Sequence, residues 1–278
     1  MNYKGNLIDF SCPLLMGVIN ITQDSFYSGS RIRSEKELVA QTEKMLAEGA
    51  DIIDIGAIST RPGVEAILPE REEAARLSAS VAVIKRYFPQ AIISIDTFRA
   101  AVVHKLVQKH GELLINDISG GTFDSEMFEA IAQLKLPYIL MHLQGNIQNM
   151  HTQTHYNSLL GDIIGFFSRQ VQKLIEMGVS DIIIDPGFGF SKTIEQNYEI
   201  LQKLQYFKIL GKPILAGFSR KSMLYKTLNT TPENALNATT AANALALTKG
   251  VSILRVHDVK EAKELVTIFA AAKQYNNI

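Results

Sequence analysis

The chain has 278 residues, of which 46% are hydrophobic and 20% charged, and its 28 basic residues balance its 28 acidic residues. This composition is typical of a globular protein with a large core, and it lacks the basic excess of a nucleic-acid-binding protein, so no nucleic-acid partner is expected. No apolar run approaches the roughly 20 residues that cross a bilayer, so no membrane association is expected either.

The first residues and the cysteine content bear on the location of the protein. Residues 1–11 contain no apolar core of the kind found in secretory leaders. Cys12 is the only cysteine in the sequence, so no internal disulfide can form, and a reducing, cytoplasmic environment is predicted. We expect the Cys12 side chain to fill a small apolar space.

Short apolar runs alternate with longer amphipathic stretches along the chain. Most runs are rich in Ile, Leu and Val without polar residues between them, which indicates strands buried on both faces of a parallel sheet. Strands are predicted at residues 14–19, 51–55, 91–95, 113–115, 138–141, 182–184, 213–216 and 253–256. Helices are predicted at residues 34–48, 70–88, 100–110, 124–134, 156–177, 193–207, 232–249 and 260–274.

Eight strands, each followed by a helix, predict an α/β protein whose residues 1–278 form a single-domain (β/α)8 TIM barrel. Barrels of roughly 250 residues fold as one unit, which agrees with the length. An open, doubly wound sheet fits the same order of elements and stays as the alternative. The first helix is predicted to begin with a capping box formed by Ser34 and Glu37, and to end before Gly49.

Polar or charged groups follow every predicted strand. In a (β/α)8 barrel the chemistry lies at the carboxyl ends of the strands, so these groups are expected to share one rim. In chain order they are Asn20, Ser59–Arg61, Asp96, Asn116 with Asp117, His142, Asp185, Ser219–Ser222 and Arg255–Asp258. Singly, each has a structural explanation as a helix cap, a turn residue or a salt-bridge partner. Their coincidence at all eight ends predicts a functional site.

Three of these groups suit a phosphorylated ligand. Asn20 offers a neutral oxygen, which is a suitable ligand for Mg²⁺, an ion that usually bridges protein oxygens to substrate phosphates. Arg255 and His257 are two residues apart, so they are predicted to point to the same face of the last strand. A guanidinium beside an imidazole is well suited to binding phosphate oxygens.

The remaining groups suit a flat, polar ring. Asp96, Asn116 and Asp185 together offer carboxylate and amide groups that match the donor and acceptor edge of a heterocycle. Lys221 is a charge on a flexible stem that can lie over or beside such a ring. Ser222, if it lies near the start of a helix, can present its hydroxyl and backbone N–H to a carboxylate.

Eight segments, in order along nearly the whole chain, resemble the signatures of the dihydropteroate synthase family. The first two are residues 15–26 (L-M-G-V-I-N-I-T-Q-D-S-F) and 49–63 (G-A-D-I-I-D-I-G-A-I-S-T-R-P-G). The others are residues 93–97 (I-S-I-D-T), 115–120 (I-N-D-I-S-G), 140–142 (L-M-H), 185–190 (D-P-G-F-G-F), 217–222 (G-F-S-R-K-S) and 255–260 (R-V-H-D-V-K). Each segment is weak alone, but S-T-R-P-G, S-R-K-S and R-V-H-D together are a specific signal.

The resemblance implies a (β/α)8 barrel that condenses 6-hydroxymethyl-7,8-dihydropterin pyrophosphate with p-aminobenzoate, giving 7,8-dihydropteroate and pyrophosphate. It also implies a step of folate synthesis, Mg²⁺ as cofactor, a homodimer and a target of sulfonamides. Asp96, Lys221 and Arg61 would be catalytic, with Asp96 stabilising positive charge on the pterin ring once the pyrophosphate leaves. Residues 241–247 and 266–272 are a candidate homodimer interface, although packing of these residues against the barrel is the favoured alternative.

The resemblance also assigns residues to three subsites. The pterin would be bound by Thr60, Asp96, Asn116, Met141, Asp185 and Lys221. The pyrophosphate would be bound by Asn20, Arg61, Arg255 and His257, with Asn20 holding the Mg²⁺. The p-aminobenzoate would be bound by Phe26, Arg61, Pro62, Phe190, Lys221 and Ser222, in a pocket completed when the first two long loops close.

The sequence departs from the family pattern in places. Gln23 stands where Pro is usual, residues 27–30 (Y-S-G-S) replace S-D-G-G, and Ile58 stands where Glu is usual. At position 23, Gln leaves φ free and supplies the backbone N–H that Pro lacks. Because the changes lie in the two long loops, they put the loop geometry and the response to sulfonamides in question more than the reaction. Two alternatives remain: a pterin-dependent methyltransferase-type barrel, and a non-catalytic pterin-binding paralogue.

Overall fold

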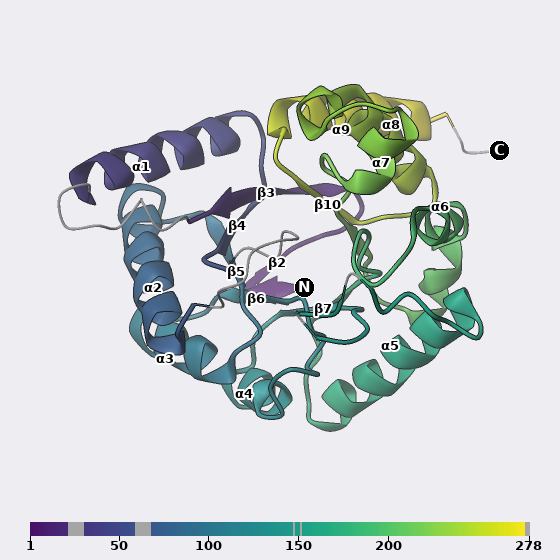
Figure 1. Ribbon diagram of the computed structural model, residues 1–278. Helices are drawn as coiled ribbons and strands as arrows, with labels where there is room; N and C mark the ends of the chain where they lie inside the picture. The colour runs from purple at the N-terminus through teal and green to yellow at the C-terminus, as the bar shows by residue number, and fades with distance from the viewer. Residues whose placement is uncertain (22–30, 59–67, 147, 151, 276–278) are drawn as a thin grey trace.

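Eight parallel strands surround one axis in the computed structural model, and helices cover the outside of the strands (Figure 1). The structure describes residues 1–21, 31–58, 68–146, 148–150 and 152–275. The barrel strands are β3 (Leu14–Asn20), β4 (Ile52–Gly56), β5 (Ile92–Asp96), β6 (Leu114–Asp117), β7 (Tyr138–Met141), β8 (Ile182–Asp185), β9 (Leu215–Ala216) and β10 (Ile253–Val256). Each predicted strand is therefore present, within a residue or two of its expected ends.

The order of the strands decides between the barrel and the open sheet. The hydrogen-bonded order is β8-β7-β6-β5-β4-β3-β10-β9, and the ladders in it are parallel. A parallel bridge between Ile184 and Ile214 joins the two outer strands, and the Ile184 N–H donates to the Pro213 carbonyl at 3.0 Å. The sheet thus returns to its own beginning, which confirms the predicted barrel.

The helices follow the strands in the predicted alternation. They are α1 (Arg31–Ala47), α2 (Glu70–Tyr87), α3 (Ala100–His110), α4 (Met127–Leu134), α5 (Leu159–Glu176), α6 (Ile194–Gln202), α7 (Ser222–Thr227), α8 (Leu236–Thr248) and α9 (Val259–Lys273), with 3-10 segments η2 (Leu204–Leu210) and η3 (Pro232–Asn234). The predicted helix over 193–207 is therefore two elements, α6 and η2. The predicted helix over 232–249 is likewise divided into η3 and α8.

Local signals account for some helix ends and not for others. α1 begins at Arg31, so Ser34 lies inside the helix and the predicted capping box at Ser34 is wrong. The same motif does occur at α6, where the Thr193 hydroxyl accepts from the Gln196 N–H and the Gln196 side chain accepts from the Thr193 N–H. Gly49 follows the end of α1 as predicted, with a φ of 101° that favours glycine.

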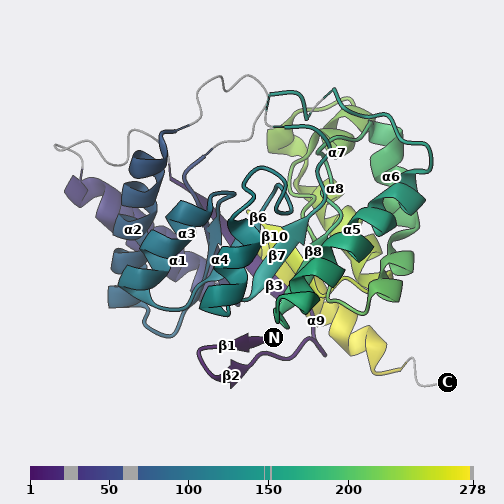
Figure 2. The ribbon, with the colours of Figure 1, turned by 90° about the horizontal axis from the view of Figure 1, so that it is seen from below.

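A short hairpin that the sequence did not predict closes the amino-terminal end of the barrel (Figure 2). It consists of β1 (Asn2–Tyr3) and β2 (Asn6–Leu7), which are antiparallel. The Tyr3 side chain is buried, and its hydroxyl accepts a hydrogen bond from the Ile93 N–H of β5 at 3.2 Å. The Asn2 N–H donates to the Asp181 carboxylate at 3.0 Å, which ties the hairpin to the segment before β8.

The core has two apolar layers. One lies between the strands and the surrounding helices. The other fills the barrel at its amino-terminal end and consists of Met16, Ile52, Leu114, Ile139, Ile183, Leu215 and Ile253, with Met1 and Phe10 packed against it. Cys12 belongs to neither layer: it is exposed, so the expectation that it fills an apolar space is wrong. Among the described residues, no helix combines the length and apolar character that a bilayer-spanning segment requires.

Candidate active site

Four polar side chains from four strands meet inside the barrel at its carboxyl end. The Arg255 guanidinium donates through Nε to the Asp54 carboxylate at 2.8 Å and through Nη2 to the Asp96 carboxylate at 2.9 Å. The Asn116 amide donates to the same Asp54 oxygen at 3.1 Å. Asp54 is fully buried, and within the described part of the chain its second oxygen has no hydrogen-bond partner. One arginine therefore holds two carboxylates that would otherwise repel each other.

Burial and mutual charge set the protonation of this group. Desolvation raises the pKa of Asp96 to about 7, although the neighbouring Arg255 charge acts in the opposite direction and lowers it. Burial by itself lowers the pKa of Arg255, but Asp54 and Asp96 outweigh burial and raise it above its ordinary value. Arg255 thus stays charged across the working pH range, while Asp96 can change its protonation state near neutrality.

A second charged pair lies at the ends of β8 and β9. Burial raises the pKa of Asp185, and the nearby Lys221 charge opposes this effect. Burial lowers the pKa of Lys221 to about 8, and Asp185 opposes that shift in turn. The Asp185 carboxylate accepts the Gly187 N–H at 2.8 Å, and the Lys221 ammonium donates to the Phe188 carbonyl. A buried carboxyl group and a half-buried ammonium group therefore lie together beside the Arg255 cluster.

An apolar wall stands next to these charges. The Lys221 Nζ lies over the Phe190 ring, 4.8 Å from its centroid. Phe190 and Ile58 pack against a buried cluster that consists of Phe98, Ile118, Met141, Leu143 and Met150. Ile58, the residue that stands where the family usually has Glu, thus belongs to an apolar cluster that also contains Met141. An aromatic ring with a cation over it, beside an apolar wall, suits the binding of a flat ring.

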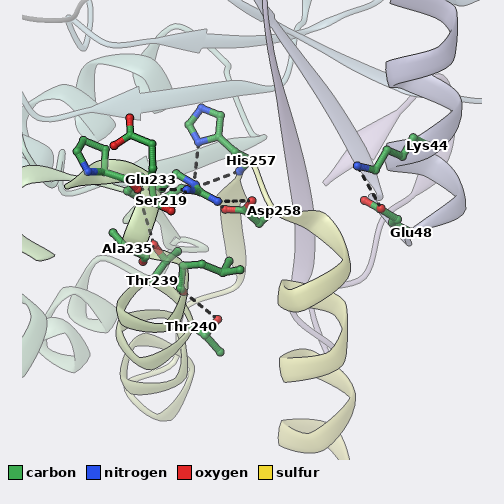
Figure 3. Close-up of polar contacts among 12 residues, drawn as sticks. Lys44, Glu48, Ser219, Glu233, Ala235, Thr239, Thr240, His257 and Asp258 are labelled. Atoms are coloured by element: carbon green, nitrogen blue, oxygen red, sulfur yellow. Dashed lines mark hydrogen bonds and ion pairs between the residues drawn. The ribbon is translucent and has the colours of Figure 1, made fainter. Parts of the chain in front are cut away.

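The outer rim carries polar groups that are more exposed. The Ser219 hydroxyl lies 2.9 Å from His257 Nδ1 and also contacts the His257 N–H, as Figure 3 shows. Arg220, between Ser219 and Lys221, binds the Asp258 carboxylate with Nε at 3.0 Å and Nη2 at 2.9 Å. It also donates to the carbonyls of two residues in η3. Arg220 thereby fixes the segment before α7 to the segment before α9.

The structure places every described candidate at the carboxyl ends of the strands. They are Asn20 (β3), Asp96 (β5), Asn116 (β6), Met141 (β7), Asp185 and Phe190 (β8 and after), Lys221 and Ser222 (after β9), and Arg255 and His257 (β10 and after). Ser222 is the first residue of α7, as predicted. Phe26, Thr60, Arg61 and Pro62 lie outside the described residues, as do the departures at Gln23 and 27–30.

Some of the described candidate residues are in direct contact with each other, and others are not. Asp96 contacts Arg255, and Lys221 contacts Phe190. Asn20 ends β3 beside Gly56 of β4, and its side chain is exposed. The described residues contain no group of three or more acidic, histidine or cysteine side chains that would hold a metal on their own.

Comparisons with known proteins agree with this geometry. Residues 16–257 match the model of the family described as pterin binding enzymes. The dihydropteroate synthase of Synechocystis is 41% identical over 259 residues, which are 91% of this chain and 88% of that protein. The chain belongs to the dihydropteroate synthase family. The folic acid synthesis protein of Pneumocystis carinii is 40% identical over 93% of this chain, which spans only 36% of that longer protein.

Solved structures of the family share the fold over the whole chain. The Yersinia pestis dihydropteroate synthase, solved with a sulfonamide drug, has a TM-score of 0.89 and 35% identity, covering 99% of this chain and 98% of that one. The Xanthomonas albilineans dihydropteroate synthase, solved with 4-aminobenzoic acid, has a TM-score of 0.85 and 33% identity, covering 97% and 96%. The expected family and barrel are thus both confirmed.

Sequence reasoning missed two buried groups of this family member. Asp54 lies in the middle of an apolar strand (I-I-D-I-G), and a charged residue at such a position was a signal that something must pair with it. Lys192 follows the D-P-G-F-G-F segment and is also buried, with its Nζ 3.1 Å from His142 Nδ1. Nothing in its local sequence distinguishes Lys192 from an exposed lysine, because its acceptors come from distant or backbone atoms.

Proposed function

We propose that this chain is a dihydropteroate synthase: it joins 6-hydroxymethyl-7,8-dihydropterin pyrophosphate to p-aminobenzoate and releases pyrophosphate. The observation on which this rests most is the buried cluster of Asp54, Asp96, Asn116 and Arg255 at the carboxyl end of the barrel. Relatives solved with 4-aminobenzoic acid and with a sulfonamide drug support the choice of the second substrate.

The pterin is assigned to the inner cluster. Its ring edge presents alternating donors and acceptors, and Asp96, Asn116 and Asp185 supply the matching carboxylate and amide groups from the ends of β5, β6 and β8. Met141 and the apolar cluster around it provide a surface for the ring face. The Lys221 ammonium contacts the Phe188 carbonyl, within reach of the same ring.

The reaction exchanges one bond for another at the methylene carbon of the pterin. The carbon–oxygen bond to the pyrophosphate breaks, and its electron pair leaves with the pyrophosphate. Positive charge then develops on the pterin-methyl group, and the ionised Asp96 stabilises it at short range. The amine nitrogen of p-aminobenzoate forms the new bond and loses one proton. No nucleophile or strong base from the protein is needed for these steps.

The departing pyrophosphate is assigned to the outer rim. His257 and Asn20 are exposed at the ends of two adjacent strands, β10 and β3. Arg255, two residues before His257, would add its charge from the inner cluster. Arg61, which lies outside the described residues, is assigned to the same subsite. Mg²⁺ fits this arrangement with Asn20 as its protein ligand, because Mg²⁺ commonly takes few protein ligands and completes its shell with water and phosphate oxygens. Bound there, the ion would neutralise charge on the leaving group.

The p-aminobenzoate is assigned to the side that faces Phe190. The Phe190 ring and the Lys221 stem flank this side, and Ser222 opens α7 next to them. Phe26, Arg61 and Pro62 would complete the subsite. The amine nitrogen would then face the methylene carbon, while the carboxylate points to Ser222 and the solvent.

A pyrophosphate-release assay tests the function directly. With dihydropterin pyrophosphate, p-aminobenzoate and Mg²⁺ present, we expect pyrophosphate and dihydropteroate in equal amounts, and loss of both when p-aminobenzoate or Mg²⁺ is omitted. Transfer of a methyl group from methyltetrahydrofolate would indicate a methyltransferase instead. Binding of the pterin substrate without any turnover at saturating p-aminobenzoate would indicate a non-catalytic paralogue.

A homodimer and a cytoplasmic location are part of the same proposal. Leu245 of α8 and Ile268 of α9 are exposed, at 52% and 70%, although other apolar residues of these helices pack against the barrel. Exposed apolar side chains on neighbouring helices are consistent with a homodimer that buries this face. Light scattering should therefore give twice the mass of 30.8 kDa. The absence of a second cysteine supports a cytoplasmic location.

A further inference from the structure

The backbone turn that follows β8 is organised around a buried ammonium group. Lys192 is 8% exposed, and its Nζ donates to the Gly187 carbonyl at 3.1 Å and to the Phe190 carbonyl at 3.0 Å. The third acceptor is His142 Nδ1, at 3.1 Å. A lysine ammonium has three N–H donors, so all three are used here.

The protonation of His142 is consistent with this role. Burial, and secondarily the Lys192 charge, holds the pKa of His142 well below its ordinary value, so the imidazole is neutral. Nδ1 can accept from the ammonium only if the ring proton is on Nε2. The ring is held by aromatic neighbours, with the Phe166 centroid at 5.1 Å in an edge contact. The acceptor is therefore fixed in place before Lys192 reaches it.

The backbone of the same turn has several residues with positive φ, so it needs contacts that hold it in this shape. Gly187 and Gly189 have φ values of 72° and 80°, and Ser191 has a φ of 51°. A Cβ on Gly187 would lie 2.2 Å from the His142 carbonyl oxygen, so the turn passes directly against β7. The Gly187 carbonyl accepts from Lys192 and also from the Phe190 N–H at 3.2 Å, and the Phe190 carbonyl accepts from Lys192. The ammonium therefore joins the two ends of the turn to each other and to His142.

This turn carries the groups that the proposed function assigns to p-aminobenzoate. Phe190 is its last aromatic residue, and the Phe188 carbonyl accepts from Lys221. Lys221 lies against Gly189, where an added Cβ would come within 3.0 Å of its Cδ. The position of the turn therefore sets both the Phe190 ring and the Lys221 stem.

We propose that Lys192 is a positioning residue for the p-aminobenzoate side of the site: its ammonium is the internal centre around which residues 187–190 are folded. It touches neither substrate, and it acts through Phe190 and Lys221. The choice of p-aminobenzoate as the affected substrate rests on the proposed function. The role of Lys192 in holding residues 187–190 does not depend on that function. Loss of the ammonium should displace the Phe190 side of the site and leave the Asp96 and Arg255 cluster unchanged.

The first test is the variant Lys192→Met, which keeps the length of the side chain and removes the donors. Burial lowers the pKa of Lys192 to about 7, so assays at pH 6.5 retain its ammonium. We expect the KM for p-aminobenzoate to rise roughly tenfold or more, and the KM for the pterin pyrophosphate to change less than about twofold. The matched control is Lys203→Met, an exposed lysine at the end of α6 that pairs with Glu199.

A second readout does not depend on turnover. The sequence contains no tryptophan, so Phe190→Trp introduces a single tryptophan on the turn, whose emission can be excited apart from that of the tyrosines. Adding Lys192→Met to that variant should shift the emission maximum and increase quenching by acrylamide, whereas adding Lys203→Met should not. If the wild-type protein releases no pyrophosphate, the proposed function fails and this arm still tests Lys192.

A third arm covers the case in which Lys192→Met does not fold. In Lys192→Ala, propylammonium supplies the missing stem and charge, and it should restore the thermal stability and the KM for p-aminobenzoate. Tetramethylammonium, which has the same charge and no donors, should restore neither. Equal changes in both KM values, an unchanged emission spectrum, or rescue by neither cation would each overturn the proposal.

Discussion

The two ends of the barrel interior are built from inward-facing residues of the same strands. The amino-terminal end is apolar, whereas the carboxyl end is polar and charged. On a strand, residues two apart point to the same side, about 7 Å from each other. The paired positions are Ile52 and Asp54, Leu114 and Asn116, Ile183 and Asp185, and Ile253 and Arg255. In each pair the first residue belongs to the apolar layer. The second is a polar residue: Asp54, Asn116 and Arg255 belong to the hydrogen-bonded cluster, and Asp185 lies beside it.

This contrast shows how the barrel separates stability from chemistry within one strand length. The apolar end is closed by the β1–β2 hairpin and contributes burial, whereas the polar end holds charges that are desolvated and must be paired (Figure 2). Substitutions at the two ends should therefore fall into two classes. Those at the carboxyl end should change turnover, and those at the amino end should change the free energy of unfolding.

The largest effect is expected from Asp96→Asn at the polar end. This change removes the carboxylate that would face the cationic intermediate, and it leaves a side chain of nearly the same shape. We expect kcat to fall about 10²- to 10³-fold, as is typical when one stabilising group is lost from an active site. The free energy of unfolding should be unchanged or slightly higher, because a partly desolvated charge is removed.

The matched control for that variant is Asp124→Asn. The Asp124 carboxylate accepts the Ala100 N–H at 2.7 Å, at the start of α3, and the Glu126 N–H at 3.0 Å with its other oxygen. An asparagine oxygen can keep the first of these bonds, and the second lies on an exposed turn without candidate site residues. Pyrophosphate release should be near the wild-type rate in this control. A wild-type kcat in Asp96→Asn itself would rule out the role given to that carboxylate.

The next effect is expected at the apolar end, from Ile183→Ala. Ile183 is 1% exposed and two residues before Asp185 on the same strand. Removing its side chain should lower the free energy of unfolding by about 2–5 kcal/mol, measured by urea denaturation. At a temperature well below the melting transition, kcat should stay within about threefold of wild type. A loss of kcat as large as that of Asp96→Asn would contradict the view that the apolar end affects stability and not turnover.

The pH dependence of turnover should reflect the protonation of Asp96 at the polar end of the barrel. Because burial raises the pKa of Asp96 to about 7, its carboxylate is mostly protonated below neutral pH. We expect kcat/KM for the pterin pyrophosphate to fall about tenfold per pH unit below 7 and to level off above it. Asp96→Asn should lack this acid limb. The measurement is initial pyrophosphate release from pH 5 to pH 8.

The same shift has a consequence for stability, with a definite sign. The pKa of Asp96 is higher in the folded chain than its ordinary value of 3.8, so the folded state binds that proton more tightly. This contribution is fully present below about pH 4 and is lost as the pH rises to about 7. Wild type should therefore lose stability relative to Asp96→Asn over that interval, which denaturation at pH 4 and pH 7 can show.

Sequence alone predicted the barrel and its polar rim because both follow from local patterns. Buried parallel strands appear as apolar runs, and each run here ends in a polar group that stands out against it. Asp96 and Arg255 were found in this way, and their direct contact then follows from the closed barrel. What the pattern could not show is pairing across strands, such as that of Arg255 with Asp54, which lies 201 residues away in the chain.

The elements that were missed lack a periodic signal. The β1–β2 hairpin has two residues in each strand, too few for any alternation to be visible. The capping box predicted at Ser34 failed because α1 extends past it to Arg31, so a matching motif inside a helix was taken for its beginning. Lys192 was missed since its three acceptors come from a turn and from β7, and no spacing in the sequence brings them together.

The smallest effect is expected from Tyr3→Phe in the hairpin. This change removes only the hydroxyl that accepts the buried Ile93 N–H, and it retains the aromatic ring. The loss should be about 1 kcal/mol of unfolding free energy, the usual contribution of one hydrogen bond, with kcat and both KM values unchanged. Tyr206→Phe, at an exposed tyrosine, should show neither change. Because Ile93 lies three residues before Asp96, altered turnover in Tyr3→Phe would show that the hairpin influences the position of the catalytic carboxylate through β5.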